Sequence, residues 1–217
     1  MARKQFEHEF LKFEELEAES VDGKRYYRLP DGSLVKSVTT IIGEKSDKTA
    51  LMEWKKRVGE AEAQKISTQA ANRGTAMHTI CERYLLNEEH YPRSAMPSNI
   101  DSFKQLRPFL DRNIEKVYGL EAPLYSYQLK TAGRSDCIAS WNGTPTIVDF
   151  KTSRKLKKAE WIENYFVQAT CYAMMCEERT GLHIPQIVVL IAVDDEQPQL
   201  FSYTTDMFVD KVKQIFC

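Results

Sequence analysis

A predicted β-hairpin between Gly133 and Lys151 constrains this chain more than any other segment. Two runs with strand composition, 134–141 and 145–151, flank the dipeptide Asn142-Gly143. An Asn-Gly pair between such runs favours a type I′ turn, because both central residues of that turn need a positive φ. A two-residue turn also fixes the pairing register of its strands. The hairpin therefore predicts which side chains lie opposite each other.

This register brings two acidic side chains together. Asp136 falls directly across from Asp149, and Lys151 lies two residues further along on the same face. Directly opposed side chains have Cβ atoms ~5 Å apart, so like charges there destabilise the pair. A divalent cation, Mg²⁺ or Mn²⁺, would remove most of this cost, and the carbonyl of Phe150 offers it a further oxygen. The alternative is two solvent-facing acids beside an ordinary lysine.

The composition is that of a globular protein, and positive charge is concentrated in one segment of the chain. The chain has 217 residues, 42% hydrophobic and 28% charged, which is typical of a globular domain with a full core. The net charge of −1 does not by itself indicate a nucleic-acid-binding protein. However, the segment 151–158, KTSRKLKK, contains five basic residues and no acid directly after the hairpin.

Several kinds of segment are missing from the sequence. No apolar run reaches ~18 residues, so we expect no membrane span. The first ten residues have no apolar signal core, and Glu7 and Glu9 argue against an acid-poor mitochondrial presequence. We therefore expect a cytoplasmic location, in a bacterial or phage-infected cell, rather than the mitochondrial matrix. The five cysteines form no CxxC pair, so a zinc site is not predicted.

Periodicity and turn signals predict the order of elements. Short strands are expected at 25–29 and 34–42, although Ser37 could instead cap a short helix, and 6–16 fits either a helix or an edge strand. The remaining predictions are helices from 49 and over 60–86 separated by Gly59, a loop at 87–99, a helix at 100–118, a strand at 121–130, the hairpin, a helix from about 157 to 179 ended by Gly181, strands at 186–193 and 199–204, and a helix at 207–216. This order indicates an α/β sandwich with a central mixed sheet and helices on both faces.

The helix after the hairpin carries a polar aromatic stripe. Trp161, Tyr165, Gln168 and Tyr172 follow helical spacing along one face. Such a face could line a groove and stack bases or bond phosphates. The alternative is an amphipathic helix whose aromatic rings bridge the core and its rim.

The predicted long helix contains the segment RGTAMH, residues 73–78. Gly74 costs a helix interior ~1 kcal/mol relative to alanine, which suggests close packing or a ligand near the backbone. Arg73 and His78 flank it. A lone helical histidine is more often structural or exposed than a ligand, so this motif alone does not decide between the two.

Taken together, these pieces resemble the PD-(D/E)XK nuclease superfamily, and within it the RecB-like exonucleases. The resemblance covers residues 73–172 and extends to SVTTIIG at 37–43, which is similar to phage and mitochondrial-genome-maintenance exonucleases. The matching pieces are RGTAMH (73–78), Glu121, GRSD (133–136), VDFK (148–151), Gln168 and Tyr172.

The resemblance implies a restriction-endonuclease-like sandwich and a role for each matched residue. Residues 1–217 would form a single nuclease domain, with 1–60 as an N-terminal extension of strands and short helices and 61–217 as the nuclease core. Asp136 and Asp149 would bind the metal, Lys151 would activate water or stabilise charge, and Gln168 would orient Lys151 or the phosphate. Further expected ligands and contacts are Phe150, Glu121 and His78 for metal, and Arg73, Arg154, Lys155, Tyr165 and Tyr172 for nucleic acid.

The sequence therefore predicts an Mg²⁺- or Mn²⁺-dependent DNA exonuclease acting on single strands or ends in recombination, repair or replication, with a protein partner of those processes. The iron–sulfur branch of the family that this chain resembles uses four cysteines, one before the nuclease core and three after it. No cysteine precedes residue 73 here, so an iron–sulfur cluster is not expected. Two alternatives remain open: an endonuclease of the same fold acting on branched or duplex DNA, and a catalytically silent nucleic-acid-binding module. A plain protein-interaction domain would require every motif match to be chance.

Overall fold

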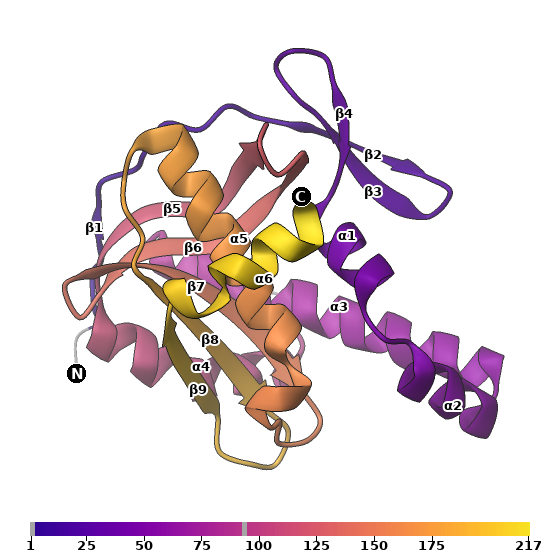
Figure 1. Ribbon diagram of the computed structural model, residues 1–217. Helices are drawn as coiled ribbons and strands as arrows, with labels where there is room; N and C mark the ends of the chain where they lie inside the picture. The colour runs from indigo at the N-terminus through magenta and orange to yellow at the C-terminus, as the bar shows by residue number, and fades with distance from the viewer. Residues whose placement is uncertain (1–2, 93–94) are drawn as a thin grey trace.

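A computed structural model describes residues 3–92 and 95–217, and its centre is a six-stranded mixed sheet between two layers of helices (Figure 1). Residues 93 and 94, which belong to the predicted loop 87–99, lie outside the described residues. The sheet has the order β1 (Glu7–His8), β5 (Ile114–Ser126), β6 (Thr131–Trp141), β7 (Thr144–Ser153), β8 (Gln186–Val193) and β9 (Gln199–Thr204). The β1–β5 and β7–β8 pairs are parallel and the others antiparallel, so the predicted mixed sandwich is confirmed.

Helices cover both faces of this sheet because its central strands are apolar on both sides. In β7, Ile147 packs toward α1 (Val38–Lys45), α5 (Glu163–Thr180) and α6 (Asp206–Phe216). The next residue, Val148, packs toward α3 (Glu60–Leu85) and α4 (Pro97–Asn113) on the opposite face. Alternation along a doubly covered strand produces this division into two cores.

The hairpin that links β6 and β7 has the predicted turn and register. Asn142 and Gly143 have φ values of 51° and 82°, as a type I′ turn requires. The ladder runs from Trp141↔Thr144 to Cys137↔Val148. Asp136 and Asp149 are the next residues along the two strands, at the point where the ladder ends and the strands separate.

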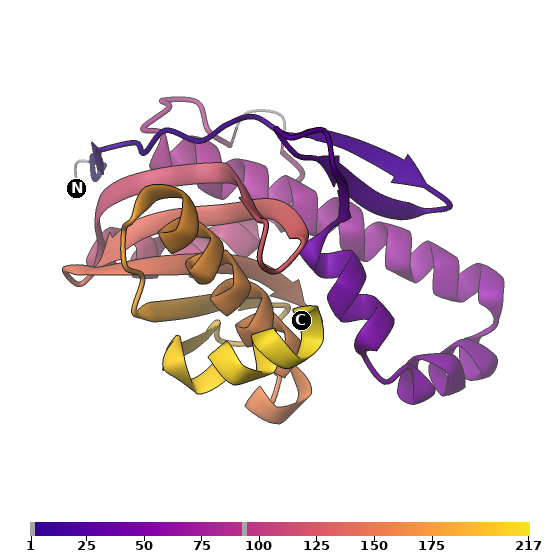
Figure 2. The ribbon, with the colours of Figure 1, turned by 45° about the horizontal axis from the view of Figure 1, so that its top comes forward.

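A smaller antiparallel sheet precedes the main body of the chain. It consists of β2 (Glu17–Val21), β3 (Lys24–Arg28) and β4 (Leu34–Lys36). The buried side chains of Tyr27 and Leu29 pack it against Tyr125 and Ala132 of the main sheet. Helix α2 (Thr49–Val58) and the first part of α3 extend away from the body as a helical pair (Figure 2).

The predicted helix 100–118 is wrong at both ends. Helix α4 begins at Pro97 and stops at Asn113, and residues 114–118 belong to β5. Ile114 and Val117 are both fully buried, but register shifts between Ile114, Val117 and Gly119 interrupt the normal alternation. Two inward side chains three residues apart therefore imitate helical spacing within a strand.

Other boundaries also differ from the prediction. The strand expected at 34–42 ends at Lys36, and Ser37 caps α1 by accepting the N–H of Thr40 at 3.1 Å, as the alternative proposed. Between residues 6 and 16, only Glu7–His8 forms a strand. The helix expected from 157 starts at Glu163, after a short 3-10 turn at Ala159–Trp161. Among residues 3–92 and 95–217, no helix combines the length and the apolar character needed to cross a bilayer.

Candidate active site

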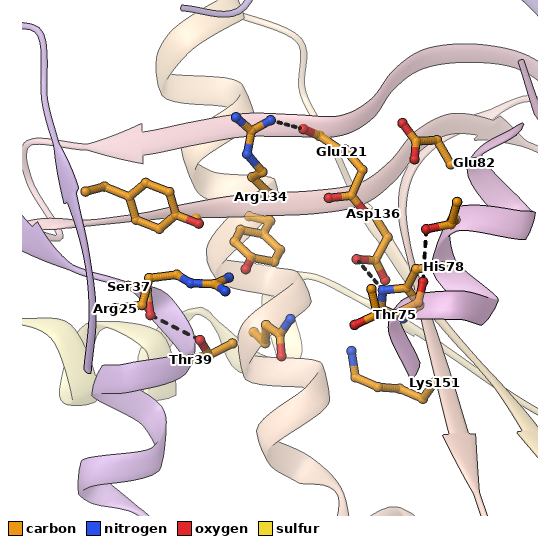
Figure 3. A pocket seen from close by; sticks show the side chains of 15 residues that line it. Arg25, Ser37, Thr39, Thr75, His78, Glu82, Glu121, Arg134, Asp136 and Lys151 are labelled. Carbon is orange, nitrogen blue, oxygen red and sulfur yellow. Dashed lines mark hydrogen bonds and ion pairs between the residues drawn. The ribbon is translucent and has the colours of Figure 1, made fainter. Parts of the chain in front are cut away.

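A pocket of about 620 Å³ opens where β6 and β7 separate, between α3 on one side and α5 on the other (Figure 3). Helices from both faces reach this point because no further strand pairing fills it. The lining residues are Arg25, Tyr27, Ser37, Thr39, Thr75, His78, Thr79, Glu82, Glu121, Gly133, Arg134, Asp136, Lys151, Gln168 and Tyr172.

Asp136 holds the two separating strands together. Its Oδ2 atom accepts the main-chain N–H of Phe150 at 2.8 Å, in place of the next rung of the ladder. The carbonyl of Phe150 in turn accepts a hydrogen bond from Nε2 of His78 on α3 at 2.5 Å. The predicted metal ligand Phe150 therefore has its carbonyl bonded to another predicted ligand, His78.

The bond to Phe150 also selects the tautomer of the neutral His78 ring. A carbonyl can only accept, so Nε2 carries a proton and the neutral ring presents the lone pair of Nδ1. Nδ1 lies 3.6 Å from Oδ1 of Asp136. Two acceptors facing each other repel unless a proton or a cation lies between them.

Glu121 completes a group of three metal-ligating side chains. One ligand atom each from His78, Glu121 and Asp136 lies within 4.8 Å of the others. Burial, followed by the charge of Asp136, raises the pKa of the Glu121 carboxyl. Two oxygens and one imidazole nitrogen at this spacing suit a divalent cation, and a cation would offset the repulsion between the carboxylates of Glu121 and Asp136.

Glu121, which belongs to this cluster, has a strained backbone conformation. Its φ is 44°, in the left-handed region that is uncommon for a residue with a side chain. Leu120 packs toward the α3 and α4 side, whereas Ala122 packs toward the α5 side. The alternation of β5 is thus broken at Glu121, and the guanidinium of Arg134 holds its carbonyl at 2.9 Å.

The buried Asp149 pairs with Lys151, which is partly exposed in the pocket, so the acid does not form an open acidic face with Asp136. Asp149 is 2% exposed, and its Oδ2 lies 2.5 Å from Nζ of Lys151. Gln168 on α5 donates to the other oxygen at 3.3 Å. Burial outweighs the nearby ammonium and holds the pKa of Asp149 above its usual range. For Lys151, burial is outweighed by Asp149 and Asp136, so its pKa is also raised.

The tyrosines predicted to face nucleic acid are less accessible than expected. Tyr172 is only 4% exposed, so the structure does not offer its ring as a stacking surface. Tyr165 is half-buried, with the Lys151 ammonium 5.2 Å from its ring centre. Trp161 lies before α5 and is 63% exposed, so the predicted four-residue stripe is interrupted.

The predicted phosphate contacts lie outside this pocket. Arg73 and Arg154 line a neighbouring hollow of about 580 Å³, and Arg73 is paired with Asp194 at 2.5 Å. Lys155 is exposed in the basic segment after β7. A Cβ added to Gly74 would meet nothing within 4 Å, so close packing does not explain this glycine.

The sequence interpretation missed several lining residues. Glu82 follows His78 by four residues on one face of α3, and Arg134 precedes Asp136 by two on one face of β6, so spacing could have indicated both. Nothing in the local sequence of Arg25 or Thr39 indicated a place in this pocket, because their approach depends on how the small sheet and α1 pack.

Comparison with known proteins defines the class of protein to which this chain belongs. The PD-(D/E)XK nuclease superfamily profile matches residues 24–214, and the chain belongs to this superfamily. It is therefore a hydrolytic nuclease whose substrate is nucleic acid. A search of curated proteins gave no match.

The solved structures that are similar to this chain include the following two. One is a protein described as a candidate exonuclease from Eubacterium rectale, with 10% identity and a TM-score of 0.40 over 66% of this chain and 67% of that one. The other is SSO0001, with 15% identity and a TM-score of 0.31 over 64% of this chain and 73% of that one.

Gly133 and the ring of Tyr172 approach each other closely in the pocket wall. A Cβ on Gly133 would lie 2.8 Å from Cε1 and from the hydroxyl oxygen of Tyr172, whose buried ring cannot move freely. We expect Gly133→Ala to lower the free energy of unfolding by about 1–3 kcal/mol, as overpacking does. Urea denaturation measures this loss. Adding Tyr172→Leu to that variant should recover part of the stability, and strictly additive losses would contradict the predicted clash.

Proposed function

We propose that this protein is a divalent-metal-dependent DNA exonuclease that removes nucleotides from single strands or ends during replication, recombination or repair. The observation that carries the proposal is the cluster of His78, Glu121 and Asp136 in a pocket that Lys151 also lines, in a chain of the PD-(D/E)XK superfamily. Lys151 is paired there with the buried Asp149. The acids supply oxygen ligands, and the ammonium supplies positive charge next to them.

Glu121, Asp136 and Nδ1 of His78 would hold Mg²⁺ or Mn²⁺ in this proposal. The bound ion supplies Lewis-acid stabilisation of phosphate charge and lowers the pKa of coordinated water. The bond from Nε2 to the Phe150 carbonyl orients the His78 ring for this task, as outer hydrogen bonds do for metal-binding histidines.

Lys151 fits the role of a cation better than that of a proton acceptor. Its raised pKa keeps the ammonium charged, and its contact with Asp149 fixes it at the pocket wall. A fixed ammonium stabilises the negative charge that develops on a phosphoryl group during hydrolysis. Gln168 binds the other oxygen of Asp149 and thereby positions the carboxylate that holds Lys151.

The size and surroundings of the pocket favour a single strand. Its volume of about 620 Å³ is in the range of small-ligand pockets, which suits nucleotides of one strand better than a duplex. The exposed residues Arg154 and Lys155 follow β7 directly and extend the positive charge outward. Such residues attract the phosphate backbone in a salt-dependent way.

Metal binding can be tested without measuring activity. Addition of Mg²⁺ or Mn²⁺ to metal-free protein should raise the thermal midpoint, because a ligand that binds only the folded state stabilises it. Glu121→Gln and Asp136→Asn should each lose most of this shift, whereas the matched surface control Asp101→Asn, whose exposed acid pairs with Lys104, should keep it. An equal shift in all four proteins would place the ion elsewhere.

The catalytic assignment is tested by two substitutions. Asp149→Ala and Lys151→Ala should each reduce Mg²⁺-dependent degradation of labelled DNA by at least about 10²-fold, because each removes a preorganised charge beside the reacting phosphate. Circular dichroism should confirm that both variants fold. Lys104→Ala, which removes an exposed lysine, is the control and should retain full activity. Undiminished activity in Asp149→Ala and Lys151→Ala would exclude these residues from catalysis.

The type of cleavage is decided by the form of the substrate. We expect release of nucleotides from 5′- or 3′-labelled linear DNA with Mg²⁺, faster from single strands than from duplex, and none with EDTA. Circular single-stranded and circular duplex DNA should both stay intact, because an exonuclease needs an end. Cleavage of either circle would establish an endonuclease, and DNA binding without any cleavage would establish a silent binding module.

A further inference from the structure

The pocket wall opposite the acid cluster is formed by the N-terminal part of the chain. Arg25 on β3 points its guanidinium into the pocket, next to Ser37 and Thr39 at the start of α1 (Figure 3). Arg25 and Tyr27 are two residues apart in β3 and therefore lie on the same face of the strand. Tyr27 is 2% exposed in the contact between the two sheets. The buried tyrosine therefore turns this face of the strand toward the pocket.

The main chain of Arg25 is fixed in place. Its carbonyl accepts the N–H of Ser37 at 2.9 Å and the hydroxyl of Thr40 at 3.3 Å. These bonds join β3 to the first turn of α1, so the arginine projects from a defined position although its side chain is exposed. A preorganised position reduces the entropy lost when a side chain binds a ligand.

The guanidinium of Arg25 differs from those of the arginines around it. Within the part of the chain that the structure describes, no hydrogen bond or ion pair engages it. Arg28, three residues later, is bound to Glu19 at 2.8 Å. Arg134, which also lines the pocket, binds Glu15 and the carbonyl of Glu121. Arg25 thus brings an uncompensated positive charge into the pocket.

The acids that line the pocket lie at one end, where Lys151 also lies. The lining acids are Glu82, Glu121 and Asp136, and Figure 3 shows them gathered near His78, away from Arg25. At the other end, Arg25 lies beside the exposed residue Thr39, away from the acids that line the pocket. A guanidinium with a hydroxyl nearby is suited to a phosphate, which it binds through two parallel hydrogen bonds.

We propose that Arg25 is a substrate-binding residue that holds one phosphate of a nucleic-acid strand while a neighbouring phosphodiester lies at the acid cluster. This inference rests on the proposed nuclease function. The phosphate is either an internal phosphodiester or a terminal phosphate monoester, since both present the same oxygens to a guanidinium. In either case, the segment 1–60 supplies part of the substrate site.

The test measures binding of a labelled single-stranded oligonucleotide by fluorescence anisotropy in EDTA, over a series of salt concentrations. Arg25→Ala should weaken binding about tenfold and reduce the slope of log K against log salt by about 0.7, as loss of one single-strand phosphate contact does. Arg25→Lys should keep the slope and recover part of the affinity. Oligonucleotides with and without a 5′- or 3′-phosphate identify the source: dependence on a terminal phosphate indicates an end-binding site.

Arg28→Ala is the matched control, because it removes the same side chain from the same strand outside the pocket. It should bind like the unaltered protein, and thermal melting should show that both alanine variants remain folded. Equal affinity and salt slope for Arg25→Ala and Arg28→Ala would overturn the proposal.

This outcome is separable from the nuclease function. If the unaltered protein degrades DNA with Mg²⁺ but Arg25→Ala keeps the same KM, the phosphate-binding role fails while the nuclease function stands. If the unaltered protein releases no nucleotides, the anisotropy comparison still decides whether Arg25 binds phosphate.

Discussion

The hydrogen bond from the Phe150 N–H to the Asp136 carboxylate is the interaction on which the rest of the site depends. It replaces a rung of the β6–β7 ladder with a side chain, so the two strands separate without leaving a backbone donor unpaired. The peptide group on the other side of Phe150 then directs its carbonyl to His78. A single acid therefore links β6, β7 and α3, and it aims its second oxygen at the histidine nitrogen.

The three acids of this region, Glu121, Asp136 and Asp149, differ in how their negative charge is compensated. Asp149 is almost fully buried and is compensated by Lys151 and Gln168, whereas no lysine or arginine of residues 3–92 and 95–217 forms an ion pair with Glu121 or Asp136. Titratable groups with perturbed pKa values tend to cluster at functional sites, and the pKa of Glu121 is raised by burial and by the charge of Asp136. The two carboxylates and the His78 nitrogen that lie together are thus the physical reason for placing a metal ion with them, and Lys151 beside them supplies a fixed charge.

The turn between β6 and β7 made the centre of the site predictable, because two residues with positive φ set the register of every later pair. The sequence could not show that the ladder ends at Cys137 and Val148, since that depends on Asp136 capping a backbone N–H. Helical spacing misplaced Ile114 and Val117, because a bulged strand also directs residues three apart to one side. The place of Arg25 depends on a contact between sheets that are far apart in sequence, which no local pattern reports.

The position of Arg25 also changes how the N-terminal part of this nuclease is understood. Within the N-terminal segment 1–60, β3 and α1 form one wall of the pocket, and Tyr27 anchors that wall to β6 through Ala132. The superfamily match begins at Lys24, so it already includes this wall. A cluster of ligands at the end of a hairpin can hold an ion, but it cannot align a strand along the pocket. A second fixed point of opposite charge, across the pocket from the acids, provides the alignment that the cluster lacks.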